Sequence, residues 1–268
     1  MRPAIINVMD RAARRASRNL LRDFGEVEQL QVSRKGAADF VSAADIRAEE
    51  KLREELVRAR PDFGFLGEEG GATVAGDGIH RWIVDPLDGT TNFLHGLPHF
   101  AISIGLERQG EIIAGVVYEP LRDELYWAER NGGAWLNDRR LRVSARSHLP
   151  DSVIATGIPF LGAGDHRRYL ATLEAMMKEV AGIRRFGVAS LDLAYVAAGR
   201  FDGFWEYGLK PWDIAAGIII VREAGGFISD FDGGNTMMTS GNVLAANDQL
   251  HRPLQKLIKD ADPGPTGS

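Results

Sequence analysis

A mixed α/β (α+β) fold, in which sheets are layered between helices, is predicted by two patterns in this 268-residue sequence. Between residues 100 and about 143, apolar segments of strand length are separated by turn-forming residues, which indicates an antiparallel meander. After that region, expected helices and short strands alternate, as in α/β architectures. No linker rich in Gly, Ser or Pro separates the two regions. We therefore predict one compact unit and a disordered tail, with these bounds: the unit at 1–262, its sub-domains at about 1–143 and 144–262, and the tail at 263–268.

The first expected elements are two helices. An apolar stripe follows Pro3, a residue that suits a first helical turn, and the arginines opposite it are interpreted as a solvated face. These arginines are Arg11, Arg15, Arg18 and Arg22. A second helix is expected at about 43–60, because Pro61 disfavours helical geometry in the residue before it. Its expected apolar face consists of Ile46, Leu52, Leu56 and Val57.

The remaining elements are read from hydrophobic periodicity and turn residues. Two short strands should precede the meander, at about 63–67 and 81–85. After the meander, the pattern predicts helices at about 166–180, 191–198 and 213–223, and a last helix from about residue 248. Strands are expected between these helices, at about 201–205, 227–230 and 243–246.

The composition excludes several classes of protein. Hydrophobic residues make up 44% and charged residues 26% of the chain, which is ordinary for a soluble globular protein. No apolar run approaches the roughly 18 residues of a membrane span, and the first residues lack the apolar core of a secretory signal. The absence of cysteine excludes disulfides and thiolate chemistry and is consistent with the cytoplasm. A net charge of −5 argues against a surface that coats nucleic acid. We expect a cytoplasmic protein without direct membrane or nucleic-acid binding.

The most informative segment is 82–93. A run of β-forming residues ends at Asp85, and Asp88 follows three residues later. Pro86 fixes the turn between them, so that the two carboxylates can converge. Converging carboxylates repel each other unless a cation neutralises them, and hard divalent cations prefer such oxygen ligands. From Gly89 onward, the backbone N–H groups of a helix start would bind an anion, so a metal and a phosphate would lie side by side.

Further acidic residues stand near other expected strand ends. The pair Glu68-Glu69 follows one strand, Glu206 follows another, and Asp213 begins a helix. Each also has a purely structural interpretation, because Asp88 and Asp213 can cap helices and a Glu-Glu pair alone is typical of a solvated loop. Taken together, they gather where α/β folds place their functional sites.

Several of these segments resemble the signatures of the inositol monophosphatase family, most closely its bacterial, SuhB-type branch. The first signature is similar to residues 85–93 and the second to residues 212–226. Further matching segments occur in the expected order and are Lys35, 41–45, Gly67-Glu68-Glu69, Arg184-Arg185 and Gly241-Asn242. The resemblance covers essentially residues 4–255. It implies a layered αβαβα sandwich of the inositol monophosphatase and fructose-1,6-bisphosphatase type, a homodimer, and two to three Mg²⁺ ions per subunit.

The resemblance also implies roles for particular residues. It gives metal binding to Glu68, Asp85, the carbonyl of Leu87, Asp88 and Asp213. Catalytic roles fall to Glu68, Thr90, Asp45 and Asp88, with Glu69 near the water. Phosphate and substrate contacts would come from Asp88, Gly89, Thr90, Ala189, Glu206 and Asp213. Lys35 lies on a mobile loop near the site. Where the family usually has Ser or Thr, this chain has Val188, which puts a hydrogen bond near the alcohol in doubt and bears on substrate preference.

The function implied is Mg²⁺-dependent, lithium-sensitive hydrolysis of inositol 1-phosphate, or a related sugar or polyol phosphate, by direct attack of a metal-activated water. Two alternatives stay open. The scaffold also serves other small-molecule phosphatases, including fructose-1,6-bisphosphatases and NADP phosphatases. Bacterial members of the family can also join the RNA-transcription machinery as protein partners. The sequence contains neither a Gly-x-Ser-x-Gly nucleophile elbow nor a Walker-type phosphate loop, and its six histidines show no metal-binding spacing.

Overall fold

The structure, a computed structural model, describes residues 2–26, 32–35, 39–74, 76–159 and 164–263. The predicted tail lies outside these ranges from residue 264 onward. Within them, no helix combines the length and the apolar character needed to span a membrane.

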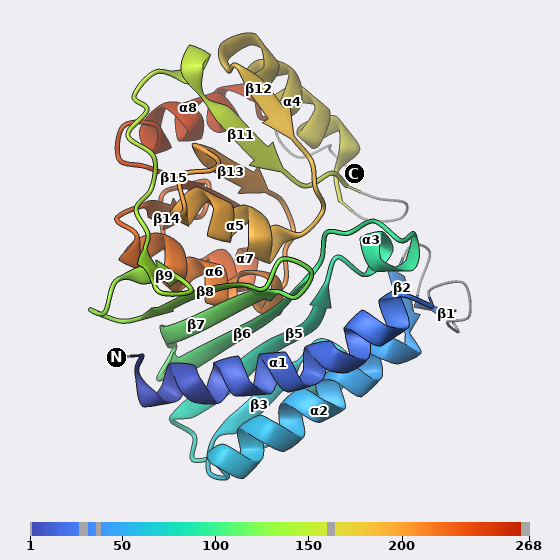
Figure 1. Cartoon of the computed structure of the whole chain (residues 1–268). Helices are drawn as coiled ribbons and strands as arrows, with labels where there is room; N and C mark the ends of the chain where they lie inside the picture. Colours follow the sequence, from blue (N-terminus) through green and yellow to red (C-terminus); the bar gives the residue numbers. More distant parts are fainter. Residues whose placement is uncertain (1, 27–31, 36–38, 75, 160–163, 264–268) are drawn as a thin grey trace.

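Five layers of alternating helices and sheets make up the molecule (Figure 1). The outer layers are the pair α1 (Ala4–Phe24) and α2 (Ala43–Ala59) and the pair α4 (His166–Glu179) and α8 (His251–Ala261). The central layer is α5 (Ala189–Ala197) and α6 (Pro211–Glu223). Because α5 and α6 lie between two sheets, their residues are apolar nearly all round. Two short helices are α3 (Thr90–Leu94) and α7 (Met237–Ser240).

The larger sheet has eight strands in the order β10-β9-β8-β7-β6-β5-β3-β4. Only the β3–β5 pair is parallel. The strands are β3 (Gly64–Gly67), β4 (Gly71–Val74), β5 (His80–Asp88), β6 (Ala101–Arg108), β7 (Glu111–Glu119), β8 (Glu124–Glu129), β9 (Ala134–Leu136) and β10 (Arg139–Arg140). The predicted meander is thus confirmed as β6 to β10.

The smaller sheet has five strands in the order β12-β11-β13-β15-β14. Here β11 pairs in parallel with both β12 and β13, and the other pairs are antiparallel. The strands are β11 (Val153–Thr156), β12 (Gly182–Arg184), β13 (Gly203–Glu206), β14 (Phe227–Ser229) and β15 (Val243–Ala246). A separate hairpin consists of β1 (Val32–Lys35) and β2 (Asp39–Ser42).

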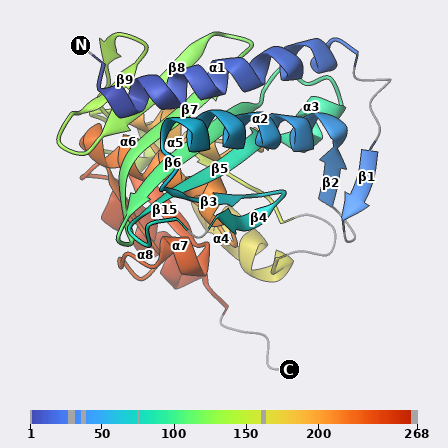
Figure 2. The same ribbon diagram turned by 90° about the horizontal axis from the view of Figure 1, so that it is seen from below.

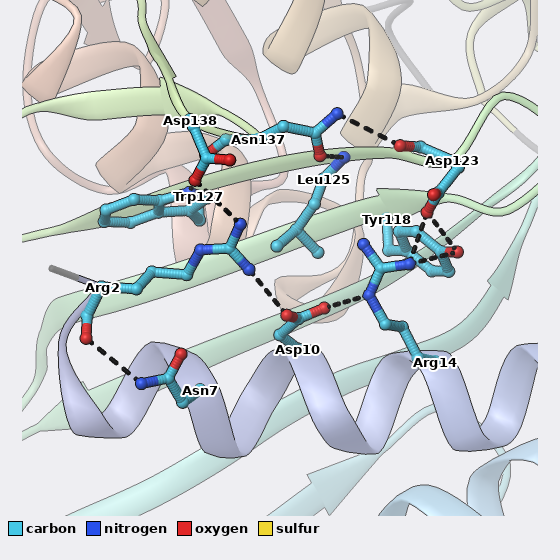
Figure 3. Close-up of polar contacts among 10 residues, drawn as sticks. All are labelled: Arg2, Asn7, Asp10, Arg14, Tyr118, Asp123, Leu125, Trp127, Asn137 and Asp138. Atoms are coloured by element: carbon cyan, nitrogen blue, oxygen red, sulfur yellow. Dashed lines mark hydrogen bonds and ion pairs between the residues drawn. The ribbon is translucent and has the colours of Figure 1, made fainter.

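Helices α1 and α2 lie side by side across the outer face of the larger sheet (Figure 2). Side chains fix α1 to that face (Figure 3). Asp10 accepts a hydrogen bond from Arg2 (2.7 Å) and another from Arg14 Nε (2.6 Å). Arg14 also reaches Asp123 and, at 3.2 Å, the hydroxyl of Tyr118. The network joins the helix to β7 and to the turn that follows it. We call these five residues, Arg2, Asp10, Arg14, Tyr118 and Asp123, the α1 network.

Most predicted elements are confirmed within a few residues, and the layered fold is confirmed as a whole. The prediction that Ile46 faces the core is wrong, because its side chain is 43% exposed and acidic Glu49 and Glu55 are buried on that helix instead. Strands β4, β11 and β12 and the β1–β2 hairpin were not predicted. The division near residue 143 stays a prediction, since α5 and α6 pack against both sheets.

Candidate active site

An irregularity in β5 directs two aspartates to the same side of the larger sheet. Asp85 pairs with Ser103 of β6 and Asp88 pairs with Ala101, so β5 holds one extra residue between these pairs. In a regular strand, residues three apart face opposite sides, but a bulge restores them to one side. Ser103 donates a hydrogen bond to the carbonyl of Trp212 (3.1 Å), which identifies that side as the one covered by α6.

Two helix starts meet these aspartates. Asp88 Oδ2 accepts a hydrogen bond from the backbone N–H of Ser190 in the first turn of α5 (2.7 Å). Asp213 lies in the first turn of α6, where its Oδ2 accepts from the N–H of Lys210 (2.7 Å). The structural role expected of an aspartate near a helix start is therefore real for Asp213, and the same residue still faces Asp85 and Asp88.

The turn between β3 and β4 adds Glu68 and Glu69. Because β3 runs parallel to β5, the ends of both strands lie together, and the N–H of Glu68 donates to the carbonyl of Val84 (3.2 Å). Burial raises the pKa of Asp45 on α2, and repulsion from Glu68 and Glu69 raises it further, so the three carboxylates are neighbours.

Gly89 and Thr90 form the start of α3. Gly89 has φ 97°, and a Cβ placed there would lie 2.9 Å from a Val188 methyl group, so only glycine fits this close approach. The Thr90 hydroxyl lies 3.0 Å from the carbonyl oxygen of Leu87 and 3.3 Å from Asp45 Oδ2. Thr90 therefore connects the β5 loop to helix α2.

We call Asp45, Glu68, Asp85, Asp88 and Asp213 the acidic cluster. Burial raises the pKa of Asp45, Asp85 and Asp213 well above the usual aspartate value, and repulsion from neighbouring members raises it further. Burial also raises the pKa of Asp88, to about 6, although the N–H groups of α5 oppose this effect. Among the described residues, Asp85, Asp88 and Asp213 form no ion pair with Lys, Arg or His.

The donor set fits a hard divalent cation by its chemistry, since it consists of carboxylate oxygens and a nearby carbonyl. In the part of the chain that the structure describes, no group of three or more His, Cys, Asp or Glu side chains is already arranged around one point. Several cluster oxygens instead accept backbone N–H groups; Asp85 Oδ1 accepts from Leu87 at 2.9 Å. The cluster therefore collects negative charge in one space, and its assignment as a metal site is taken up as a proposal below.

The expected alcohol side lies at α5 and the end of β13. Ala189 begins α5, and Glu206 ends β13 as predicted. Burial raises the pKa of Glu206 to about 8, with a further contribution from Asp88. Val188 is fully buried against Gly89, so an apolar side chain fills the position at which the sequence resemblance implies a hydroxyl.

Sequence reasoning missed two buried acids near the site. Asp192 in α5 is inaccessible to solvent, and its carboxylate has no hydrogen-bond partner among the described residues. Its signal was an acidic residue inside an otherwise apolar helix. Glu49 in α2 follows Asp45 by four residues, a spacing that places both on one helix face. Lys35 lies in β1, and its side chain lies outside the described part of the structure.

Comparisons with known proteins show which family and which solved structures this chain resembles. A profile described as the inositol monophosphatase family matches residues 3–262. A Rhizobium meliloti protein named inositol-1-monophosphatase is 60% identical over 258 residues, covering 96% of this chain and 97% of the relative. A Pseudomonas aeruginosa protein named Nus factor SuhB is 43% identical, covering 95% and 96%. The crystal structure of the extragenic suppressor protein SuhB from Bartonella henselae superposes with a TM-score of 0.93 at 58% identity, covering 96% and 99%.

Proposed function

The chain belongs to the inositol monophosphatase family, and from this premise we propose that it hydrolyses inositol 1-phosphate, or a related polyol phosphate, to alcohol and phosphate. The observation that carries this proposal is the acidic cluster. Its carboxylates come from four separate segments, namely α2, the β3–β4 turn, β5 and α6. Burial, and then repulsion from neighbouring carboxylates, raises the pKa of Asp45, Asp85 and Asp213. Such a concentration of negative charge serves no packing purpose, and a bound cation would neutralise it.

The family is metal-dependent, and we propose that two to three Mg²⁺ ions bind here. Glu68, Asp85, Asp88, Asp213 and the carbonyl of Leu87 would hold them. Bound metal would supply a lower pKa for the attacking water and charge stabilisation for the phosphoryl group.

The protein's own groups would position the reactants. Glu68 and the Thr90 hydroxyl would orient the water, with Asp45 and Glu69 supporting them. The backbone at Gly89 and Thr90 would hold the phosphate. At the alcohol end, Ala189 and Glu206 would contact the substrate's hydroxyl groups, and Asp213 would lie near the departing oxygen. Lys35 is assigned to the loop that approaches the site.

A phosphate-release assay tests the function. Purified protein would be given inositol 1-phosphate beside fructose 1,6-bisphosphate, NADP and a nucleotide 3′-phosphate, with Mg²⁺ or with a chelator. We expect release from inositol 1-phosphate that stops with chelator and returns with Mg²⁺. Preference for another ester would reassign the substrate, and no release from any ester would overturn the proposal. Inhibition by millimolar lithium is also expected.

We also propose that the protein is a cytoplasmic homodimer. Light scattering tests the oligomeric state, and cell fractionation tests the location.

A second function is favoured by one specific observation, the 43% identity to a protein named Nus factor SuhB. In that role, the protein would be a partner of the RNA-transcription machinery. Because binding a partner does not need the metal ligands, capture of that machinery by an Asp85→Asn variant without catalytic activity would support the second function.

A further inference from the structure

We propose that Glu49 is a positioning residue that fixes the turn carrying Glu68. The carboxylate of Glu49 accepts two backbone hydrogen bonds, from the N–H of Glu69 at Oε2 and from the N–H of Gly70 at Oε1, both at 2.8 Å. These N–H groups belong to the three-residue turn between β3 and β4. A carboxylate that accepts two N–H groups fixes both the place and the orientation of that turn.

The Glu49 carboxylate also packs closely against Gly67. A Cβ placed on Gly67 would lie 2.4 Å from Glu49 Oε2 and 2.5 Å from the carboxyl carbon. A side chain at this position would force the Glu49 carboxylate away from its two N–H donors, so the glycine at the end of β3 makes room for the Glu49 head group. The Glu49 side chain is itself buried, at 6% exposure.

The position of Glu49 on α2 extends its effect to a second member of the acidic cluster. Asp45 lies one helical turn earlier on the same face and is fully buried beside Glu68 and Glu69. Helix α2 therefore carries one carboxylate into the cluster, and its next carboxylate holds the backbone N–H groups of Glu69 and Gly70, directly after Glu68. The helix and the turn cannot shift independently, which sets the spacing between Asp45 and Glu68.

This inference rests on the proposed function, because it concerns how Glu68 is presented to a metal ion. Residues that orient metal ligands without touching the metal change metal affinity by about 10- to 100-fold when they are mutated. We therefore expect Glu49→Ala to raise the half-saturating Mg²⁺ concentration by about tenfold or more. Glu49→Gln keeps one acceptor but turns an NH₂ group toward a backbone N–H, and a rise of about threefold is expected.

A matched control lies two turns further along the same helix. Glu55 is also buried, at 3% exposure, but it pairs with Arg15 and Arg58 rather than with a site loop. If Glu49 only stabilised α2, then Glu49→Gln and Glu55→Gln would lower the melting temperature without changing Mg²⁺ affinity. We expect the change in Mg²⁺ affinity in the Glu49 variants alone.

The experiment measures Mg²⁺ binding in two ways for each full-length variant. The first is the rise in melting temperature on Mg²⁺ titration, and the second is phosphate release from inositol 1-phosphate against Mg²⁺ concentration. Unchanged half-saturation in both Glu49 variants, with normal Mg²⁺ dependence in the unmodified protein, would overturn the positioning role alone. An unmodified protein that shows neither Mg²⁺ stabilisation nor phosphate release would instead overturn the proposed function.

A double-mutant cycle with Gly67 makes the test independent of whether Glu49→Ala lowers stability. Gly67→Ala should disturb the unmodified protein strongly, because its methyl group collides with the Glu49 carboxylate. In a Glu49→Ala background, that collision is gone, so the added cost in melting temperature and in Mg²⁺ affinity should be much smaller. Additive effects of the two substitutions would contradict the proposed contact.

Discussion

Within the described residues, three aspartates of the acidic cluster form no ion pair with Lys, Arg or His, whereas the aspartates of the α1 network are paired with arginines. In the α1 network, Asp10 lies between Arg2 and Arg14, and Asp123 contacts Arg14 and Tyr118 (Figure 3). The hydrogen bond from Arg14 lowers the pKa of Asp123. In the acidic cluster, burial and like charges raise the pKa of Asp85 and Asp213. Balanced charges attach a helix to a sheet, whereas unbalanced charges leave a site that a cation or protons must neutralise.

The largest expected effect comes from removing one charge at the centre of the acidic cluster. Asp85→Asn should lower kcat/KM by about a thousandfold or more, because Asp85 is a proposed metal ligand at the centre of the acidic cluster. In chelator, the same variant should melt at a higher temperature, because less like charge is buried. Glu206→Ala is the control and should chiefly alter the range of esters hydrolysed. Equal loss of kcat from both variants would contradict the assigned roles.

The second effect is a pH dependence of the free energy of unfolding, which has opposite signs for the acidic cluster and the α1 network. A carboxylate whose pKa is raised by folding stabilises the metal-free fold at low pH, and that stability is lost as pH rises toward the folded pKa. For Asp88, the window runs from about 4 to about 6. The lowered pKa of Asp123 acts in the reverse direction, with stability lost as the pH falls below about 4.

Chemical unfolding in chelator between pH 4 and 8 measures the first of these windows. Mg²⁺ should reverse the trend, since the ion competes with protons for the same oxygens and binds better as the pH rises. Metal-free stability that increased steadily from pH 4 to 8 would show that the acidic cluster is already neutralised by another group.

The third effect concerns the α1 network. Arg14→Met should reduce the free energy of unfolding by about 1 kcal/mol, a modest cost because the arginine is partly exposed and solvent screens its ion pairs. Urea unfolding measures this cost. Half-saturation by Mg²⁺ should stay the same, and a change in it would mean that the α1 network also shapes the site.

The smallest effect is expected at Val188. A threonine is close in size to valine, so Val188→Thr should fold normally and cost about 1 kcal/mol for the buried hydroxyl. The relative kcat/KM for inositol 1-phosphate and other polyol phosphates should shift by less than about tenfold. The substrate panel measures this ratio. A loss of all activity would place Val188 in the catalytic machinery rather than in the wall near the alcohol.

The sequence was informative wherever a local pattern determines structure. Hydrophobic periodicity located the main helices, and the motif at 85–93 indicated where acidic residues gather. It failed where partners distant in sequence decide the outcome. Strand β12 has three residues and forms only because β11 lies beside it. No local pattern indicates the role of Glu49, because the residues that it contacts, Glu69 and Gly70, are about 20 residues away. The metal ligation itself stays a prediction.

The extra residue in β5 also limits how this loop can be altered or transferred. Side chains along a strand alternate in direction. Asp85 and Asp88, three residues apart, therefore face the same side only because the pairing of β5 with β6 is offset by one residue. In a strand without this offset, the three-residue interval would send one of the two aspartates to the α1 and α2 side. A protein designer who grafts this loop onto another sheet would have to graft the offset with it.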